Sequence, residues 1–247
     1  MSSEFLRQFF VKMKELENQG QGVHLVFDLD STLFDVSPRT ERILREFIAD
    51  PTHRRLFPDE CEKIEKIQVT TQDWGFAAAL KRVGFVDLKT EFYQQLLHYW
   101  AARFFSDSYL HYDQPYPGSV EFLQRLVSFT NVNVAYLTGR DQHRMGLGSP
   151  EVLKKWDFPL MPQKAELILK PHRSLIDADF KAEWFKNHPL VEAHEFYFFE
   201  NEPVNLNRVS EITPQVKLIY FDSTHSGKEE PPSHATVISH YKIDEES

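Results

Sequence analysis

Short continuous runs of apolar residues alternate along this chain with segments in which apolar residues recur every three or four positions. Continuous runs are typical of strands that are buried on both faces of a parallel sheet, whereas the longer spacing is typical of helices. The alternation therefore predicts an α/β protein with a largely parallel sheet. The runs that define the predicted strands are 23–27, 132–137, 196–199 and 216–221, with a short last strand near 235–239.

Residues 37–114 interrupt this alternation, because apolar positions there recur at helical spacing only. The last predicted helix of the interval has Phe92, Leu96, Trp100 and Phe104 on one face. We therefore expect an all-helical insertion between the first two strands. Its predicted helices are 39–49, 58–67, 71–82 and 88–105.

Several residues of this insertion have side chains that suit ligand binding but also suit ordinary roles. Arg39, Arg42 and Arg45 lie three apart, and we interpret them as a solvated helix face rather than as a phosphate-binding stripe. A group of aromatic residues has the shape to stack on a base or sugar, although core packing is the favoured interpretation. These residues are Trp74, Phe76, Tyr93, Tyr99 and Trp100.

Two acidic residues follow the first apolar run directly. Asp28 and Asp30 come one position apart after Phe27, and ligands of parallel sheets bind beyond the carboxyl ends of the strands. Adjacent like charges raise each other's pKa unless a cation offsets them, and carboxylate oxygens suit Mg²⁺. A carboxylate can also attack phosphorus, while a second one transfers protons. A polar turn or a helix cap is the alternative interpretation.

The second strand ends in a small hydroxyl residue followed by glycine. The hydroxyl of Thr138 can donate a hydrogen bond to a phosphoryl oxygen, and Gly139 lets the backbone approach a ligand closely. Arg140 is a further candidate for substrate contact. An ordinary transition from strand to turn is the alternative interpretation of this segment.

Two lysines compete as the cation of the predicted anionic centre. Lys181 lies early in a helix that is predicted to begin near Asp177, and Lys170 precedes Pro171. An ammonium group is a compact point charge that can neutralise a phosphoryl group. We favour Lys181, because its helix leads directly into the next strand.

That next strand ends in Glu200, Asn201 and Glu202. Carboxylate and amide oxygens are candidate ligands of a hard divalent cation. Glu200 and Asn201 are both candidates for the direct contact with the metal. Glu202 is the weaker candidate, since an acidic residue also suits the start of the following helix.

Together, these four segments resemble the motifs of the haloacid dehalogenase superfamily. The first motif of that family, Asp-x-Asp-x-Thr, is matched by 28–32, and the second and third motifs are matched at Thr138 and Lys181. The fourth motif departs from the pattern, because the family usually has Asp where this chain has Glu200 and Asn201. An acid followed by Asn resembles the small C-terminal-domain phosphatases.

The resemblance implies a Rossmann-like parallel-sheet core with a helical cap of the first type. The core would comprise residues 1–36 and 115–247, and the cap residues 37–114. It also implies a Mg²⁺-dependent phosphatase that forms an aspartyl-phosphate intermediate. The implied substrate is a small phosphorylated metabolite or a nucleotide.

The resemblance further implies a role for each candidate residue. Asp28 would be the nucleophile, and Asp30 would protonate the leaving oxygen and then activate water. The phosphoryl group and the rest of the substrate would be bound by Thr138, Gly139, Arg140 and Lys181. The Mg²⁺ ligands would come from Asp28, Asp30, Glu200 and Asn201.

Two other functions fit the same residues. A phosphomutase would return the phosphoryl group to a substrate instead of to water. A non-catalytic module that binds metal or phosphate would account for the unusual Glu200–Asn201 pair. Dehalogenases of the superfamily lack the second Asp, so Asp30 argues against that branch.

The amino-acid composition limits the class of protein and the cellular compartment that we expect. The 247 residues are 41% hydrophobic, which favours a folded core over disorder. The net charge of -9 argues against strong binding to nucleic acids. The single cysteine, Cys61, fits a reducing compartment. The segment around Phe5 to Leu16 predicts an amphipathic helix rather than a signal peptide, so we expect a cytoplasmic protein without membrane spans.

Overall fold

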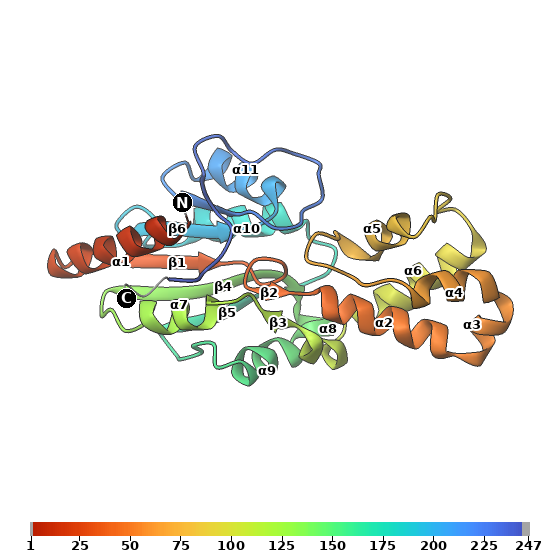
Figure 1. The fold of residues 1–247 in the computed structure, drawn as a ribbon. Coiled ribbons are helices and arrows are strands. Elements are labelled where there is room, and N and C mark those ends of the chain that lie inside the picture. The colour runs from red at the N-terminus through yellow and green to blue at the C-terminus, as the bar shows by residue number, and fades with distance from the viewer. Residues whose placement is uncertain (1, 244–247) are drawn as a thin grey trace.

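A six-stranded sheet, in which every neighbouring pair of strands is parallel, forms the centre of the molecule (Figure 1). The computed structural model describes residues 2–243. The strand order is β5-β4-β1-β6-β7-β8, so β1 lies between β4 and β6. The α/β class that the sequence predicts is confirmed. The strands are β1 (Val23–Phe27), β4 (Val132–Asp141), β5 (Ala165–Lys170), β6 (Glu195–Glu200), β7 (Lys217–Phe221) and β8 (Thr236–Ile238).

Helices cover both faces of this sheet, because successive side chains of a strand point to opposite sides. Phe27 packs in one apolar cluster with Phe9 and Phe122, which come from α1 and α7. Val26 packs in a second cluster with Phe185 of α10 and with residues of α11. The helices of this core are α1 (Ser2–Asn18), α7 (Ser119–Leu126), α8 (Gln142–Met145), α9 (Gly148–Lys155), α10 (Asp177–Asn187) and α11 (Pro203–Ile212).

The N-terminal helix α1 is the amphipathic helix that the sequence predicts. It buries Leu6, Phe9, Met13 and Leu16, which lie three or four positions apart, in the core. The ring of Phe9 meets that of Tyr197 edge to face, with the centroids 5.0 Å apart. Of the helices in residues 2–243, none has the length and apolar character that a membrane crossing requires.

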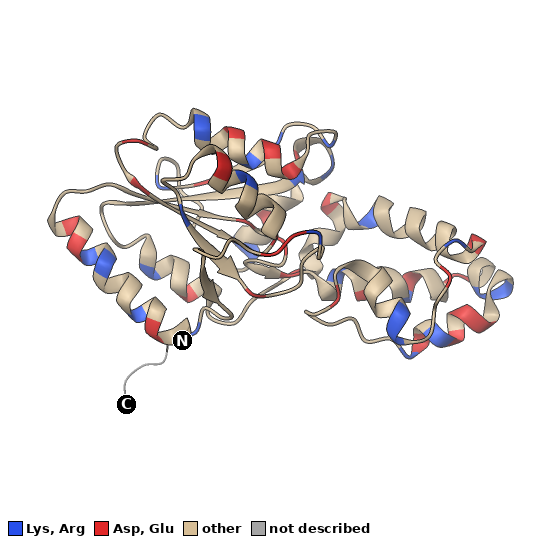
Figure 2. Cartoon of the chain, turned by 90° about the horizontal axis from the view of Figure 1, so that it is seen from above, with Lys and Arg blue, Asp and Glu red and all other residues tan. Residues whose placement is uncertain are grey.

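A separate group of helices, the helical insertion, lies beyond the carboxyl ends of the strands (Figures 1 and 2). It has an apolar core of its own that includes Phe47, Ile64, Leu80 and Leu96. The chain enters and leaves through two short antiparallel strands that pair Phe34 with Pro115. The elements are β2 (Phe34–Asp35), α2 (Ser37–Ala49), α3 (Pro51–Leu56), α4 (Pro58–Glu65), α5 (Gly75–Arg82), α6 (Glu91–Phe104), the 3₁₀ helix η1 (Asp107–Tyr112) and β3 (Gln114–Pro115).

The predicted helices of the insertion are present, but some of their ends differ. Helix α6 begins at Glu91 rather than three residues earlier, because the Thr90 side chain caps it by accepting a hydrogen bond from the backbone of Tyr93. Helix α5 begins at Gly75. The residues just before it form a turn in which the Asp73 carboxylate accepts from the backbone N–H of Thr70 at 2.8 Å. Helix α3 has no counterpart in the sequence-based prediction.

Candidate active site

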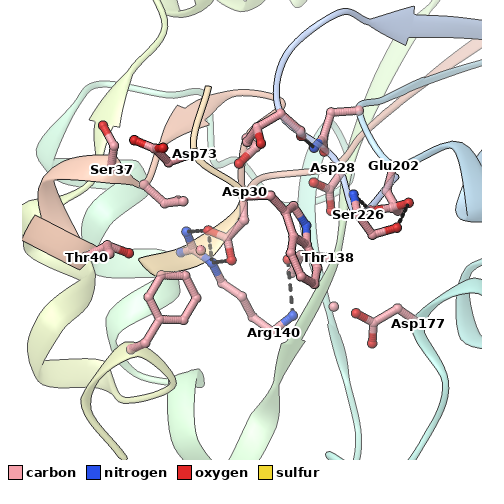
Figure 3. Close-up of a pocket in the computed structure, with 18 of the residues that line it drawn as sticks. Asp28, Asp30, Ser37, Thr40, Asp73, Thr138, Arg140, Asp177, Glu202 and Ser226 are labelled. Atoms are coloured by element: carbon pink, nitrogen blue, oxygen red, sulfur yellow. Dashed lines mark hydrogen bonds and ion pairs between the residues drawn. The ribbon is translucent and has the colours of Figure 1, made fainter. Parts of the chain in front are cut away.

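One cavity of about 650 Å³ lies between the carboxyl ends of the strands and the helical insertion, and residues of both line it. Asp28 and Asp30 reach it from the end of β1, and Thr138 and Arg140 reach it from the neighbouring strand β4 (Figure 3). Glu200 ends β6 on the other side of β1, because the register pairs Phe27 with Phe199. The parallel register therefore brings together groups that are far apart in the sequence.

Lys181 is the cation that the fold places against Asp28. Its Nζ donates to Asp28 Oδ1 and to Glu200 Oε2, each at 2.6 Å, and all three side chains are buried. Lys170 instead ends the edge strand β5, where it donates to the Asp177 carboxylate and to the backbone carbonyl of Leu175. Of these two lysines, Lys181 is thus the one that is joined to the candidate nucleophile.

The surroundings of Asp28 act on its carboxyl group in opposite directions. Burial raises the pKa of Asp28, and the neighbouring Glu200 carboxylate raises it further, while Lys181 lowers it. The net pKa lies above the ordinary range, because one ammonium faces two buried carboxylates. This trio has one negative charge more than its cation neutralises, which favours the approach of a further cation.

Asp30 lies in a cluster of two carboxylates and two guanidinium groups. Its Oδ1 accepts from Nη2 of Arg39 at 2.8 Å and from Nη2 of Arg140 at 2.5 Å. Asp113 accepts from both arginines as well, at 2.7 Å from Arg39 Nε and at 2.8 Å from Arg140 Nη2. Burial raises the pKa of Asp30, but the charges of Arg140 and Arg39 outweigh it and hold the pKa well below its usual range.

Two members of this cluster are not identified from the sequence. Arg39 is interpreted above as a solvated residue, and the structure shows that this is wrong, since its side chain is 0% exposed. Arg42 does lie at the surface, where it pairs with Glu46. A signal was present, because Arg39 lies four residues before the buried Ile43 and therefore on the buried face of α2. No sequence pattern singles out Asp113.

The end of β4, which carries Thr138, presents a free hydroxyl proton, a glycine and a buried guanidinium nitrogen. Thr138 Oγ1 accepts a hydrogen bond from the backbone N–H of Arg140 at 3.2 Å, and its hydroxyl proton is available to another acceptor. A side-chain carbon at Gly139 would lie 2.8 Å from Cγ of Asp177, so a larger residue there would have to displace the Asp177 side chain. Nη1 of Arg140 is buried without a hydrogen-bond partner in residues 2–243.

Glu200 and Asn201 differ in how fully their oxygens are used. Oε1 of Glu200 accepts from the backbone N–H groups of Asn201 and Glu202 at 2.9 Å each, and Oε2 accepts from Lys181 and Asn205. Both Glu200 oxygens therefore already face donors. Asn201 Oδ1 and Asp28 Oδ2, in contrast, both face one hydroxyl, that of Thr32, at 2.9 and 3.2 Å.

This shared hydroxyl bears on metal binding. Thr32 has one hydroxyl proton, so it satisfies only one of the two oxygens at a time. The carboxylate of Asp28 and the amide oxygen of Asn201 are hard donors of the kind that Mg²⁺ prefers. Within residues 2–243, no three His, Cys, Asp or Glu side chains are grouped as a metal would require. Mg²⁺ is commonly held by only one or two carboxylates together with water and substrate, so the donors here fit that ion.

Comparisons with known proteins agree with the fold. A family model of haloacid dehalogenase-like hydrolases matches residues 24–155, which is more than half of the chain. No curated protein matches the sequence. Among solved structures, a candidate phosphatase from Clostridium difficile has a TM-score of 0.54 at 14% identity, over 88% of this chain and 94% of that one. This similarity supports the fold.

Two further solved structures are more distant. A haloacid dehalogenase-superfamily hydrolase of subfamily IA from Geobacter sulfurreducens has a TM-score of 0.49 at 10% identity and covers 89% of this chain and 93% of that one. CbbY from Rhodobacter sphaeroides, solved in complex with phosphate, has a TM-score of 0.45 at 13% identity and covers 88% and 94%.

Proposed function

Because the chain belongs to the haloacid dehalogenase-like hydrolases, we propose that it is a Mg²⁺-dependent phosphatase that forms an aspartyl-phosphate on Asp28. The observation that carries this proposal is the position of Asp28 at the cavity, with its Oδ1 2.6 Å from Lys181 Nζ. A carboxylate that is held by an ammonium and exposed to a cavity is positioned to attack phosphorus.

Asp28 forms the covalent bond in the first half of this reaction. One of its oxygens bonds to phosphorus as the bond between phosphorus and the leaving oxygen breaks. Lys181 neutralises the negative charge, and the Thr138 hydroxyl donates to a phosphoryl oxygen. The buried Nη1 of Arg140, which has no acceptor in residues 2–243, supports the predicted contact of that residue with the substrate.

Asp30 acts in the second half. A water molecule attacks phosphorus, the bond to Asp28 breaks, and Asp30 takes the proton of the water. The two guanidinium groups at Asp30 Oδ1 hold its carboxylate at the cavity, where it can exchange protons with the leaving oxygen and with the attacking water. In the first half the same residue would protonate the leaving oxygen, and the proton that it takes from water would restore its acid form.

The oxygen donors already described are of the kind that Mg²⁺ prefers. We infer that the carboxylate of Asp28 and the amide oxygen of Asn201 hold it, because both oxygens depend on the single hydroxyl of Thr32. The bound ion would offset the excess negative charge of the site and stabilise the charge that develops on the phosphoryl oxygens. Glu200 would position Lys181 rather than bind the metal, since both of its oxygens already accept hydrogen bonds.

The helical insertion would serve as the cap. We propose residues 37–114 as this unit and residues 1–36 and 115–247 as the catalytic core. The paired strands β2 and β3 form a narrow connection, and the insertion has its own apolar core. Both units line the cavity, so the insertion would exclude water and contact the rest of the substrate.

A phosphatase assay tests the proposal. Phosphate release from a panel of alkyl and aryl phosphomonoesters is expected to require Mg²⁺ and to be abolished in Asp28→Asn. A folded protein that releases no phosphate from any member of the panel would overturn the proposal and support the non-catalytic alternative. Product analysis with an added bisphosphorylated sugar separates hydrolysis from phosphoryl transfer to a second substrate.

A further inference from the structure

The indole of Trp74 is an aromatic face of the cavity that is still uncovered. Trp74 lines the cavity and is 53% exposed, and within the described part of the chain no other ring and no basic side chain packs on it. It lies in the turn that precedes α5, between Asp73 and Gly75, whose φ is +67°. The Asp73 carboxylate accepts a hydrogen bond from Nε of Arg82 at 3.0 Å. An anchored turn therefore presents Trp74 to the cavity.

The rim of the cavity continues from this turn to a loop of the core. The hydroxyl of Thr224 donates to the backbone carbonyl of Gln72, which lies just before the turn residues Asp73 and Trp74, at 3.4 Å. Farther along the same loop, Ser226 donates to both carboxylate oxygens of Glu202, from its hydroxyl at 2.7 Å and from its backbone N–H at 2.9 Å (Figure 3). The turn of Trp74 and the loop that holds Glu202 thus form one continuous rim, and both residues line the cavity.

The lining of the cavity includes two carboxylates without a basic partner. Within the described chain, no Lys, Arg or His side chain pairs with Glu202 or with Asp35, which accept hydrogen bonds from serine residues instead. None of the described residues of the insertion that line the cavity is Lys or Arg. Lys228 lines the cavity from the same loop as Ser226, but it is exposed and is followed by Glu229 and Glu230. A cation on the substrate would therefore find a carboxylate here that no cation of the protein occupies.

Aromatic rings beside the cavity already hold cations of the protein. The guanidinium carbon of Arg39 lies 4.0 Å from the centroid of the Phe104 ring, and that of Arg144 lies 4.8 Å from the centroid of the Phe105 ring. Both phenylalanines line the cavity. A cation is attracted to the face of an aromatic ring, and tryptophan attracts it most strongly. The uncovered indole of Trp74 suits a cation of the substrate in the same way.

We propose that the leaving group of the substrate ends in an organic ammonium group, which packs on the indole of Trp74 and faces the carboxylate of Glu202. This inference rests on the proposed phosphatase activity and narrows its substrate class. The ring binds the alkyl surface of the ammonium group, and the carboxylate balances its charge. The buried Nη1 of Arg140, whose guanidinium group lies beside Asp30, remains available to an oxygen of the substrate nearer the reaction centre.

A matched substrate series tests the inference. Each member is an alkyl phosphate that ends in a trimethylammonium group, with a chain of two, four or six methylene groups. Each has a neutral counterpart in which carbon replaces nitrogen, so the two compounds have the same shape and their KM ratio isolates the charge. We expect the ammonium compound to have a KM about 3–30-fold lower at the chain length that reaches Trp74. Raised salt should reduce this preference.

Variants of the rim separate recognition from general damage. Trp74→Leu is expected to reduce the preference for the ammonium compound about 3–30-fold, and Trp74→Phe, which keeps a ring, should reduce it less. Glu202→Gln is expected to reduce the preference about 2–5-fold. Glu229→Gln is the matched control, because it makes the same change of charge on the same loop outside the cavity lining, and it should keep the preference.

The outcomes distinguish this inference from the proposed function. Equal KM values for the ammonium and neutral compounds at every chain length would overturn the substrate class while leaving a phosphatase. A preference that survives in Trp74→Leu would overturn the assignment of the site. Tighter binding of a substrate whose far end is a second anion, lost in Lys228→Met, would assign the rim to an anion and overturn the inference as well. Absence of phosphate release from every compound would instead overturn the proposed function.

Discussion

Nη2 of Arg39 lies 2.8 Å from Oδ1 of Asp30, and this contact ties the first helix of the insertion to the strand end that carries the candidate catalytic acids. The Arg39 side chain is 0% exposed and also binds Asp113, which lies where the chain returns to the core. One buried side chain thus links both connections of the insertion to the site. The cluster is balanced, with Arg39 and Arg140 facing Asp30 and Asp113.

Removing one cation from this balanced cluster is expected to be costly. In Arg39→Met, the buried Asp113 and the partly exposed Asp30 would share the single guanidinium of Arg140, and we expect the free energy of unfolding to fall by about 3 kcal/mol. Urea unfolding measures this loss. The double variant Arg39→Met/Asp113→Leu restores charge balance and should recover part of it. Arg42→Met, at the exposed pair with Glu46, is the control and should cost less than about 1 kcal/mol.

Substitution of the two candidate lysines is expected to affect activity to very different extents. Lys181→Met would leave Asp28 and Glu200 adjacent without a cation, and we expect kcat/KM to fall about 10²–10³-fold. Lys170→Met should change it less than about 10-fold, because Lys170 contacts Asp177 and the Leu175 carbonyl instead. Steady-state kinetics on both variants decides the matter. Equal losses in the two variants would show that Lys181 has no special role.

Metal dependence distinguishes Asn201 from Glu200. Asn201→Asp adds a carboxylate at an oxygen that now shares the Thr32 hydroxyl, so the Mg²⁺ concentration for half-maximal activity should fall. Asn201→Ala should raise this concentration at least 10-fold. Glu200→Gln should mainly lower kcat, because it weakens the contact with Lys181. If Glu200→Gln weakens Mg²⁺ binding more than Asn201→Ala does, the ligand assignment is wrong.

Folding stability is expected to depend on pH through a histidine at the other end of β1. His24 lies near His188 and His194, with Nε2 3.1 Å from Nδ1 of His194. Burial, together with the charges of His188 and His194, lowers the pKa of His24 to about 4. The unfolded chain, with its ordinary pKa of about 6.5, therefore binds this proton more readily.

The sign of this effect follows from the lowered pKa. Stability from His24 is fully present above about pH 6.5 and is lost as the pH falls toward 4. The loss should be on the order of 1 kcal/mol after allowance for solvent screening. Urea midpoints measured across this range in wild type and in His24→Phe test it. A His24→Phe protein with an unchanged pH slope would assign the effect to other groups.

The sequence predicts well what depends on local pattern. The apolar runs at 23–27 and 196–199 identify strands that are buried on both faces. Because these strands are parallel and in register, the residues that follow them meet at the carboxyl end of the sheet. The proximity of Lys181 to Asp28 follows in the same way, because the helix that carries Lys181 leads directly into the neighbouring strand.

Features that depend on distant pairing are not accessible from such patterns. Arg39 and Asp113 are 74 residues apart, and their contact exists only because β2 pairs with β3 and closes the insertion. A charged residue adds nothing to the apolar periodicity, so the burial of Arg39 is indicated only indirectly, by its four-residue spacing from Ile43. Core packing is the favoured interpretation of the aromatic group that contains Phe76, and Phe76 is indeed buried in the apolar core of the insertion, although it also lines the cavity.

The covalent step at Asp28 is tested most directly by mass spectrometry of acid-quenched Asp30→Asn protein after mixing with phenyl phosphate and Mg²⁺. Without its base, this variant should accumulate the intermediate. The proposed mechanism predicts one added phosphoryl group on the peptide that contains Asp28, and none when Asp28 is also replaced by Asn. Phosphate release by wild type with no phosphorylated peptide in the variant, or with the group on another residue, would contradict it.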